Sequence, residues 1–187
     1  MTMLITPGHE HLPAYVAALE RGWTPGNSGS AAEQAAQEIG HIALDPAGFI
    51  ASHDDPHALN GNVTLPDGTE IPRLPSIRRW MWQDGLCGII SLRWNPDGPL
   101  PEHVLGHVGY STVPWRRREG HASRALGIML QEARFRGLHE IYVTADDTNT
   151  GSIAVIRSNG GRFVERRTLP RSYGIGDIMV FRLTTCT

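Results

Sequence analysis

The residues best suited to chemistry form the segment RRREGHA at positions 116–122. Three consecutive arginines precede Gly120, and a helical pattern of apolar residues begins directly after it. The first N–H groups of a helix have no partner within the helix, and they lie at the positive end of its dipole. A glycine has no Cβ, so an anion can approach the backbone closely. These features favour a diphosphate site; a solvated basic turn is the simpler alternative, and the spacing alone does not separate the two.

The elements that would position this segment are a strand and a helix. Residues 104–113 are rich in β-branched and apolar side chains, which predicts a strand. Pro114 ends it, because proline has no N–H to donate. The helix is predicted up to Gly137, a common stop signal, because apolar residues recur on one face. These residues are Ala122, Ala125, Leu126, Met129, Leu130 and Ala133.

Four short motifs in this half of the chain resemble those of one known family. RREGHA at 117–122 is similar to R/Q-x-x-G-x-G/A, NTGS at 149–152 to N-x-x-S, and NGGRF at 159–163 to N-G-G/F. GHVGYSTVP at 106–114 resembles the G-H-I-G-Y-S-V-R-P of a less characterised bacterial branch. Together they resemble the GNAT superfamily of N-acetyltransferases. Arg118 is a departure, since many members have a second glycine there, so one loop amide could sit differently.

The resemblance implies a set of residues that bind acetyl-CoA as a cosubstrate. In this family the loop after the strand binds the pyrophosphate, and free backbone groups of the strand bind the pantetheine arm. The implied residues are Tyr110, Thr112, Arg117, Arg118, Glu119, Gly120, His121, Ala122, Asn149 and Ser152.

The implied reaction is direct transfer of an acetyl group to a primary amine of a small molecule or peptide. His107 is a candidate general base, because its ordinary pKa suits that task. Ser152 is a candidate for protonating the leaving thiolate, since the tyrosine that many members use would fall at Ile156. Each residue has a structural alternative: a hydrogen-bonded histidine for His107 and a helix cap for Ser152. Tyr173 in a late loop could contact the acceptor.

Two other functions remain open from the sequence. The vacant tyrosine position leaves room for a catalytically silent CoA-binding protein that acts as a sensor or interaction module. A generic nucleotide site is the third reading, and the lack of a G-x-x-x-x-G-K-[ST] motif weighs against it.

Composition narrows the class of protein. A length of 187 residues favours a single domain over residues 1–187, and a net charge of -2 argues against broad nucleic-acid binding. Cys87 and Cys186 are too few and too far apart for a disulfide framework. No signal peptide or membrane span is visible, which favours a cytoplasmic protein. No metal is expected, and HDDPH at 53–57 is interpreted as a solvated loop. A homodimer is possible, but the sequence does not decide it.

The order of the remaining patterns predicts the fold class. Strands are expected at 3–6, 77–83, 86–94, 104–113, 141–145, 163–167 and 178–183, and helices at 10–23, 30–39, 45–50, 122–133 and 152–158. Asp84-Gly85 favours a tight hairpin turn, and residues 62–75 form a small hairpin or an ordered loop. The expected fold is α/β: a mixed, mostly antiparallel central sheet with helices on both faces. The resemblance implies a GNAT fold whose one parallel strand pair splays apart.

Overall fold

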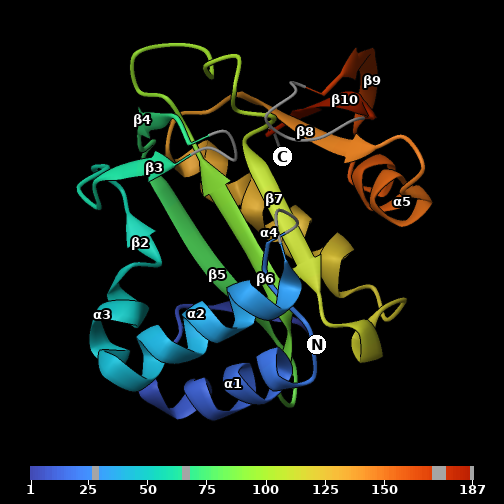
Figure 1. Ribbon diagram of the computed structural model, residues 1–187. Helices are drawn as coiled ribbons and strands as arrows, with labels where there is room; N and C mark the ends of the chain where they lie inside the picture. The colour runs from blue at the N-terminus through green and yellow to red at the C-terminus, as the bar shows by residue number, and fades with distance from the viewer. Residues whose placement is uncertain (27–29, 65–67, 170–175, 186–187) are drawn as a thin grey trace.

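The computed structural model describes residues 1–26, 30–64, 68–169 and 176–185 (Figure 1). Tyr173 and Cys186 lie outside these ranges. The strands are β1 (Met3–Ile5), β2 (Asp54–Asp55), β3 (Asn62–Thr64), β4 (Glu70–Pro72), β5 (Ser76–Trp82), β6 (Leu86–Arg93), β7 (Val108–Thr112), β8 (Glu140–Asp146), β9 (Arg162–Thr168) and β10 (Asp177–Thr184). The helices are η1 (His9–His11), α1 (Leu12–Glu20), α2 (Ala31–Leu44), α3 (Pro46–Ala51), η2 (Pro114–Arg116), α4 (His121–Phe135) and α5 (Thr150–Ser158).

The main sheet has the strand order β1-β5-β6-β7-β8-β10-β9, and β2 pairs with β5 beside this path. Within the described ranges, β7 and β8 are the parallel pair and the other paired strands are antiparallel. α4 joins β7 to β8 as the crossover that parallel strands require. The fold class predicted from the sequence is therefore confirmed.

Two hydrophobic clusters cover the two faces of the sheet. α4 packs on one face, where its Leu126 and Met129 are buried against β6 and β8. α1, α2 and α3 cover part of the opposite face, where Tyr15 stacks on Trp80 with ring centroids 4.3 Å apart. Figure 1 shows α4 behind the sheet and α1–α3 in front of it. We call the second surface the α1–α3 face.

Local signals account for several element boundaries. Ser30 Oγ accepts a hydrogen bond from the Glu33 N–H at 3.4 Å and begins α2, as predicted. The Asp84-Gly85 hairpin between β5 and β6 is confirmed, and so is the small hairpin of β3 and β4. No described helix is long and apolar enough to cross a membrane.

The segment 53–57 is not the solvated loop that the sequence suggested. Asp54 and Asp55 form β2, and the carboxylate of the buried Asp55 accepts the N–H groups of Leu59 and Asn60. His53 is also buried, with Nε2 accepting from Trp80 Nε1 at 3.0 Å. Within the described ranges, no group of three His, Cys, Asp or Glu side chains is placed to hold a metal ion.

Candidate active site

The parallel strands β7 and β8 meet at one end and separate toward the other. Val108 pairs with Val143, and the His107 N–H donates to the Tyr142 carbonyl at 2.7 Å. The strand is shorter than predicted, since β7 begins at Val108 rather than at Val104. Beyond Val108 the two strands point apart (Figure 1), and a gap opens between β7 and α5.

The register of β7 decides which main-chain groups face this gap. The Arg93 N–H donates to the His107 carbonyl at 2.8 Å, and the Val113 N–H donates to the Cys87 carbonyl at 3.0 Å. In an antiparallel pair, alternate residues of a strand bond to the same neighbour. The odd residues of β7 are therefore bonded to β6, and the even residues Tyr110 and Thr112 direct their N–H and C=O groups toward the gap.

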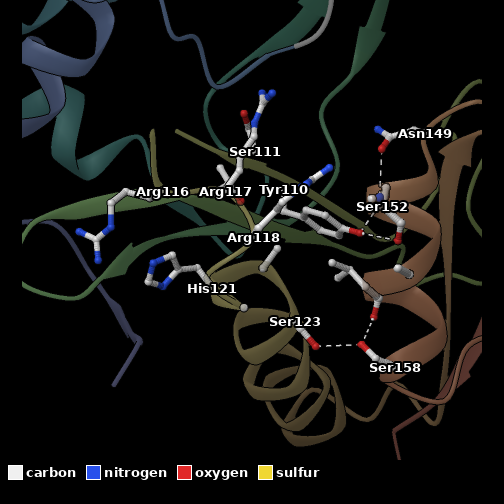
Figure 2. A pocket seen from close by; sticks show the side chains of 16 residues that line it. Tyr110, Ser111, Arg116, Arg117, Arg118, His121, Ser123, Asn149, Ser152 and Ser158 are labelled. Carbon is white, nitrogen blue, oxygen red and sulfur yellow. Dashed lines mark hydrogen bonds between the residues drawn. The ribbon is translucent and has the colours of Figure 1, made fainter. Parts of the chain in front are cut away.

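A pocket of about 700 Å³ occupies the gap and continues along the start of α4 (Figure 2). β7 and the loop after it form one wall, and α5 forms the other. The lining residues are Tyr110, Ser111, Thr112, Arg116, Arg117, Arg118, Gly120, His121, Ala122, Ser123, Asn149, Gly151, Ser152, Ala154, Val155 and Ser158.

The loop before α4 has the backbone of an anion site. Gly120 is the N-cap with φ 81°, and it supplies no side-chain cap to the first turn. The first helical bond runs from the Arg124 N–H to the Gly120 carbonyl at 3.1 Å, so the amides of residues 121–123 precede the helical ladder. Arg118 also takes a left-handed conformation, with φ 66°. The loop thus keeps, at Arg118, a conformation that glycine adopts without strain.

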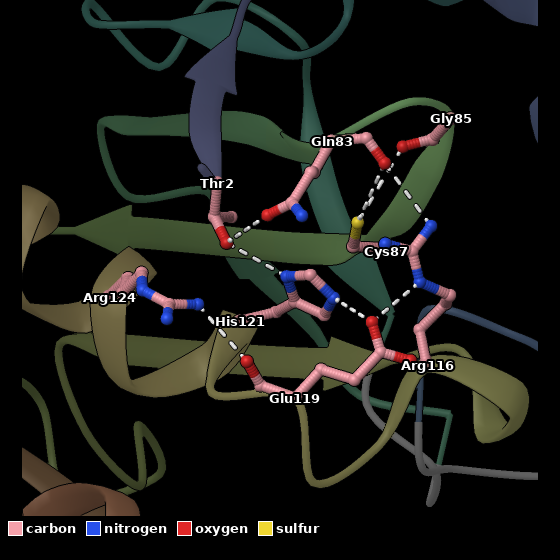
Figure 3. A network of polar contacts seen from close by, with 8 residues as sticks. All are labelled: Thr2, Gln83, Gly85, Cys87, Arg116, Glu119, His121 and Arg124. Carbon is pink, nitrogen blue, oxygen red and sulfur yellow. Dashed lines mark hydrogen bonds and ion pairs between the residues drawn. The ribbon is translucent and has the colours of Figure 1, made fainter.

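A network of polar side chains holds this loop in place (Figure 3). Glu119 accepts from Arg116 Nε at 2.9 Å and lies 2.9 Å from His121 Nε2. His121 Nδ1 is 2.8 Å from the Thr2 hydroxyl on the far side of the ring. The hydrogen bond from Arg116 is the main reason that the pKa of Glu119 is lowered. The side chains of Arg116, Glu119 and His121 therefore brace the loop, and Arg117 and Arg118 supply positive charge at the mouth.

The opposite end of the pocket holds a hydroxyl pair. The Tyr110 hydroxyl reaches from β7 to α5 and lies 2.8 Å from Ser152 Oγ (Figure 2). Burial raises the pKa of Tyr110, which keeps the phenol protonated. Asn149 Oδ1 accepts the Ser152 N–H at 3.0 Å, so Asn149 caps α5 and the Ser152 hydroxyl remains for Tyr110. Ser152 is therefore not the helix cap that the structural alternative required.

Ile156 and His107 lie outside the lining of the pocket. Ile156 is fully buried in the cluster under α4 and does not line the gap. His107 is 8% exposed, and its Nδ1 accepts the Tyr142 N–H at 3.0 Å. This bond gives His107 the structural role considered from the sequence. It opposes the general-base role, because a neutral ring that accepts at Nδ1 carries its proton on Nε2.

Sequence reasoning missed the side-chain roles of Tyr110 and Ser111. It assigned Tyr110 through its main chain only. Ser111 projects to the α1–α3 face, where its Oγ accepts from Trp23 Nε1 at 2.9 Å and donates to the Thr24 carbonyl at 3.3 Å. Strand alternation could have placed these two residues on opposite faces. No local signal shows that the segment after α1 reaches β7.

Comparisons with known proteins agree with this geometry. The family model for the acetyltransferase (GNAT) domain matches residues 70–162. Mycobacterium smegmatis RimJ in complex with a CoA disulfide superposes with a TM-score of 0.65 at 17% identity, over 98% of this chain and 81% of that one. RimL, a ribosomal L7/L12 α-N-protein acetyltransferase in complex with coenzyme A, gives 0.61 at 15% identity, over 98% and 93%. No curated protein sequence matches the chain.

A third solved structure, the microcin C7 self-immunity acetyltransferase MccE with acetyl-CoA and AMP, gives a TM-score of 0.59 at 12% identity, over 98% of this chain and 92% of that one. These likenesses show the fold. The pocket fits a molecule with an anionic diphosphate and a polar extended arm, because it joins an amide-rich helix start to a strand edge with free backbone groups.

Proposed function

We infer that this chain, a GNAT acetyltransferase that depends on acetyl-CoA, binds its cosubstrate between β7 and α5 and acetylates the primary amine of a peptide or small molecule. One observation carries the assignment of the site. A single continuous pocket runs from the uncapped start of α4, along the free edge of β7, to the hydroxyl pair of Tyr110 and Ser152. A diphosphate, an amide-bearing arm and a leaving thiolate need these three features in this order.

The loop 117–122 holds the diphosphate end. Its contribution is mainly the main-chain N–H groups at the start of α4, where the helix dipole favours negative charge. Arg117 and Arg118 add charge at the mouth. The side chains of Glu119 and His121 act indirectly, because they hold the loop in its shape.

The reacting end combines main-chain and side-chain groups. Acetyl-CoA supplies an acetyl group already activated as a thioester. The main-chain N–H groups of Tyr110 and Thr112 face the gap and can stabilise negative charge that develops on the carbonyl oxygen, an effect worth about 2.7–4 kcal/mol for a preorganised donor. The amine forms the new C–N bond and loses a proton, while the C–S bond breaks and the sulfur gains a proton. We assign that second proton to the hydroxyl pair of Ser152 and Tyr110.

The acceptor approaches from the α1–α3 face. Ser111 belongs to β7, which borders the gap, and its side chain projects to that face beside Trp23. The amine and the acetyl-CoA arm can therefore meet at β7 from opposite faces of the sheet. This arrangement suits direct transfer in a ternary complex, where catalysis comes largely from alignment of the two substrates.

The test pairs two glycine variants at the two ends of α4. Gly120 and Gly137 have φ 81° and 79°, so a side chain must take the left-handed backbone conformation at both positions. Gly120→Glu also places a carboxylate at the diphosphate. We expect calorimetry to show CoA binding weakened at least tenfold, about 1.4 kcal/mol. Gly137→Glu is the matched control and should leave CoA affinity unchanged. Equal affinity in a folded Gly120→Glu variant would remove the assignment of the site.

Turnover separates an enzyme from a silent CoA-binding protein. A thiol-release assay with acetyl-CoA and a panel of amines should show release of CoA that depends on the amine. Tight CoA binding without release for any peptide or small amine would favour the sensor or interaction module instead. Thermal stabilisation by ATP or NAD in place of CoA would favour the generic nucleotide site.

A further inference from the structure

The strand β7 lies between β6 and β8, and its two ends have different neighbours. At its start, Val108 pairs with Leu92 of β6 and with Val143 of β8. At its end, Thr112 pairs with Gly88 of β6 and borders the pocket on its other side. In Figure 1, β8 leads away from β6 and β7, which stay side by side. The width of the gap therefore depends on how closely the end of β7 lies against β6.

Gly88 lets the backbones of β6 and β7 approach more closely than a side chain would permit. A Cβ added to Gly88 would lie 2.2 Å from the Ser111 carbonyl oxygen and 2.8 Å from the Thr112 Cα. Both distances are shorter than those that Cβ atoms show in proteins, and both partners are main-chain atoms that cannot rotate away. Gly88 also has φ 151°, a conformation that glycine adopts without strain. The end of β7 thus keeps its place against β6 because position 88 has no side chain.

The strand β6 also has a β-bulge beside Gly88. The register of β5 against β6 shifts by one residue between Met81 and Trp82, which leaves Cys87 as an extra residue in β6. A β-bulge bends its strand and increases the local twist. The Cys87 carbonyl accepts the Val113 N–H at 3.0 Å, so the bulge holds the residue that follows β7. The bulge and the glycine therefore both act at the open end of the gap.

The start of β7 makes a second close approach, on the side of β8. A Cβ added to Gly106 would lie 2.9 Å from the Tyr142 carbonyl oxygen. The same oxygen accepts the His107 N–H at 2.7 Å. The chain is therefore held against β8 where β7 begins and against β6 where β7 ends, so β7 runs obliquely between its two neighbours.

We propose that Gly88 is a positioning residue for acetyl-CoA, because it keeps the end of β7 away from β8 and so sets the width of the gap for the pantetheine arm. This inference rests on the proposed function, which puts that arm between β7 and α5. The main-chain groups of Tyr110 and Thr112 face the gap, so a side chain at position 88 would displace them toward the arm. The loop 117–122 has its own support in the network around Glu119. The effect should therefore fall on the arm and spare the diphosphate.

The test compares CoA with the part of CoA that has no pantetheine arm. The probes are CoA and 3′-phosphoadenosine 5′-diphosphate, each titrated by calorimetry into the full chain. Gly88→Ala should weaken CoA binding about tenfold or more, the effect of one or two lost hydrogen bonds, and should change the affinity for the nucleotide less than about threefold.

Gly98→Ala is the matched control for backbone conformation. Gly98 has φ 147°, close to that of Gly88, but an added Cβ would contact none of the described residues within 4 Å apart from its chain neighbours. This variant should leave both affinities unchanged. If the nucleotide alone binds too weakly to measure, the ratio between the CoA affinities of Gly88→Ala and Gly98→Ala decides the question.

A second variant takes the place of Gly88→Ala if that protein does not fold. Gly106→Ala moves the start of β7 away from the Tyr142 carbonyl and so changes the angle at which the strand leaves β8. It should weaken CoA binding about threefold or more and spare the nucleotide. Gly109→Ala is its control on β7, because an added Cβ there would lie at an ordinary distance of 3.5 Å from the Arg93 guanidinium.

Two results would overturn the role of Gly88. One is CoA affinity in Gly88→Ala, or in Gly106→Ala where the first variant does not fold, equal to that of its control. The other is an equal loss for CoA and the nucleotide, which would indicate general damage to the fold. Gly120→Glu separates this inference from the proposed site: loss of CoA binding in that variant alone contradicts only the role of Gly88. Normal CoA binding in Gly120→Glu with a loss in Gly88→Ala contradicts the diphosphate site and supports the role of the gap.

Discussion

At the scale of single residues, Tyr110 uses its main chain and its side chain for different tasks. Its N–H and C=O groups face the gap, because the odd residues of β7 are bonded to β6. Its hydroxyl meets Ser152 at 2.8 Å at the reacting end. Ile156 of α5, by contrast, offers only a buried side chain outside the pocket lining. The pair Tyr110–Ser152 is therefore the strongest candidate for proton donation in the pocket.

Removing the Tyr110 hydroxyl should slow the chemical step without weakening the binding of CoA. We expect Tyr110→Phe to lower kcat by roughly 10²-fold, the lower end of the range for positioned proton transfer, and to change the Kd of CoA less than threefold. Ser152→Ala should have a similar effect, and the double variant should be little worse than either single variant, because the two groups act as a unit.

Steady-state kinetics and calorimetry check this prediction. Tyr142→Phe serves as the control, because it removes a hydroxyl from β8 outside the pocket lining. A Tyr110→Phe protein with normal kcat and only a lower melting temperature would make the hydroxyl pair purely structural.

At the scale of elements, the turn from β7 into α4 has a strained backbone that neighbouring side chains hold in place. Arg118 holds φ 66°, a conformation that costs a residue with a Cβ about 1–2 kcal/mol. The network of Arg116, Glu119 and His121 ties the turn to Thr2 and Gln83, so the strain is retained. At the other wall, Ser123 of α4 and Ser158 of α5 are 2.9 Å apart, and Asn159 donates to the Ser123 carbonyl. Both walls of the pocket are thus fixed to α4.

Glycine substitutions at Arg117 and Arg118 separate backbone strain from charge. Arg118→Gly should raise the free energy of unfolding by up to about 1 kcal/mol, because glycine adopts the left-handed conformation without strain. Arg117 has φ -69° and ψ 155°, so Arg117→Gly should lower stability instead. Both changes remove one positive charge and should weaken CoA binding to a similar extent. Urea unfolding and calorimetry measure the two effects, and a loss of stability in Arg118→Gly would contradict the strain argument.

At the scale of the whole molecule, the two faces of the sheet support different parts of the proposed site. The cluster under α4 holds β6, β7 and β8 together where the gap begins, and the cluster under α1–α3 supports the face from which we propose the acceptor approaches. His53 links α3 to β5, because Nδ1 contacts the Phe49 carbonyl at 2.9 Å and Nε2 accepts from Trp80. Burial, with a smaller contribution from the charge of Arg78, lowers the pKa of His53 to about 4.

The depressed pKa of His53 makes global stability depend on pH. Between an ordinary pKa near 6.5 and the folded value of about 4, the unfolded chain binds a proton that the folded chain excludes. Stability from this residue is therefore present above about pH 6.5 and is lost as the pH falls toward 4, by roughly 2–3 kcal/mol at pH 4.5. His53→Gln keeps a donor and an acceptor but has no proton to gain.

The measurement is the free energy of unfolding by urea at pH 7.5 and at pH 4.5. The loss between the two should be smaller in His53→Gln than in the unchanged protein. His57→Gln, at an exposed histidine in the same segment, should show the full loss. An identical loss in all three proteins would mean that His53 is not excluded from protonation in the folded state.

The sequence determined most of the elements through local signals, and the loop proposed to bind the cosubstrate is also visible in it. The spacing of apolar residues predicts α4, and Pro114 and Gly137 mark the two ends of its segment. Ser30 caps α2, and Asp84-Gly85 forms the turn of the main hairpin. Each of these signals acts within a few residues, so a linear chain displays it completely. The loop at 117–122 was predicted for the same reason, since an anion site at a helix start needs only contiguous backbone.

Only the tertiary structure decided which side chains meet across the elements. Strand register pairs His107 with Tyr142 and takes the histidine out of the pocket lining, and it sets Gly88 opposite Thr112. The packing of α5 beside β7 joins Ser152 to Tyr110 over 42 residues of chain. Such contacts depend on the relative placement of elements, which a one-residue slip of register would reverse. No local pattern of residues contains that placement. The placement decides whether a polar side chain lines the pocket or supports the fold.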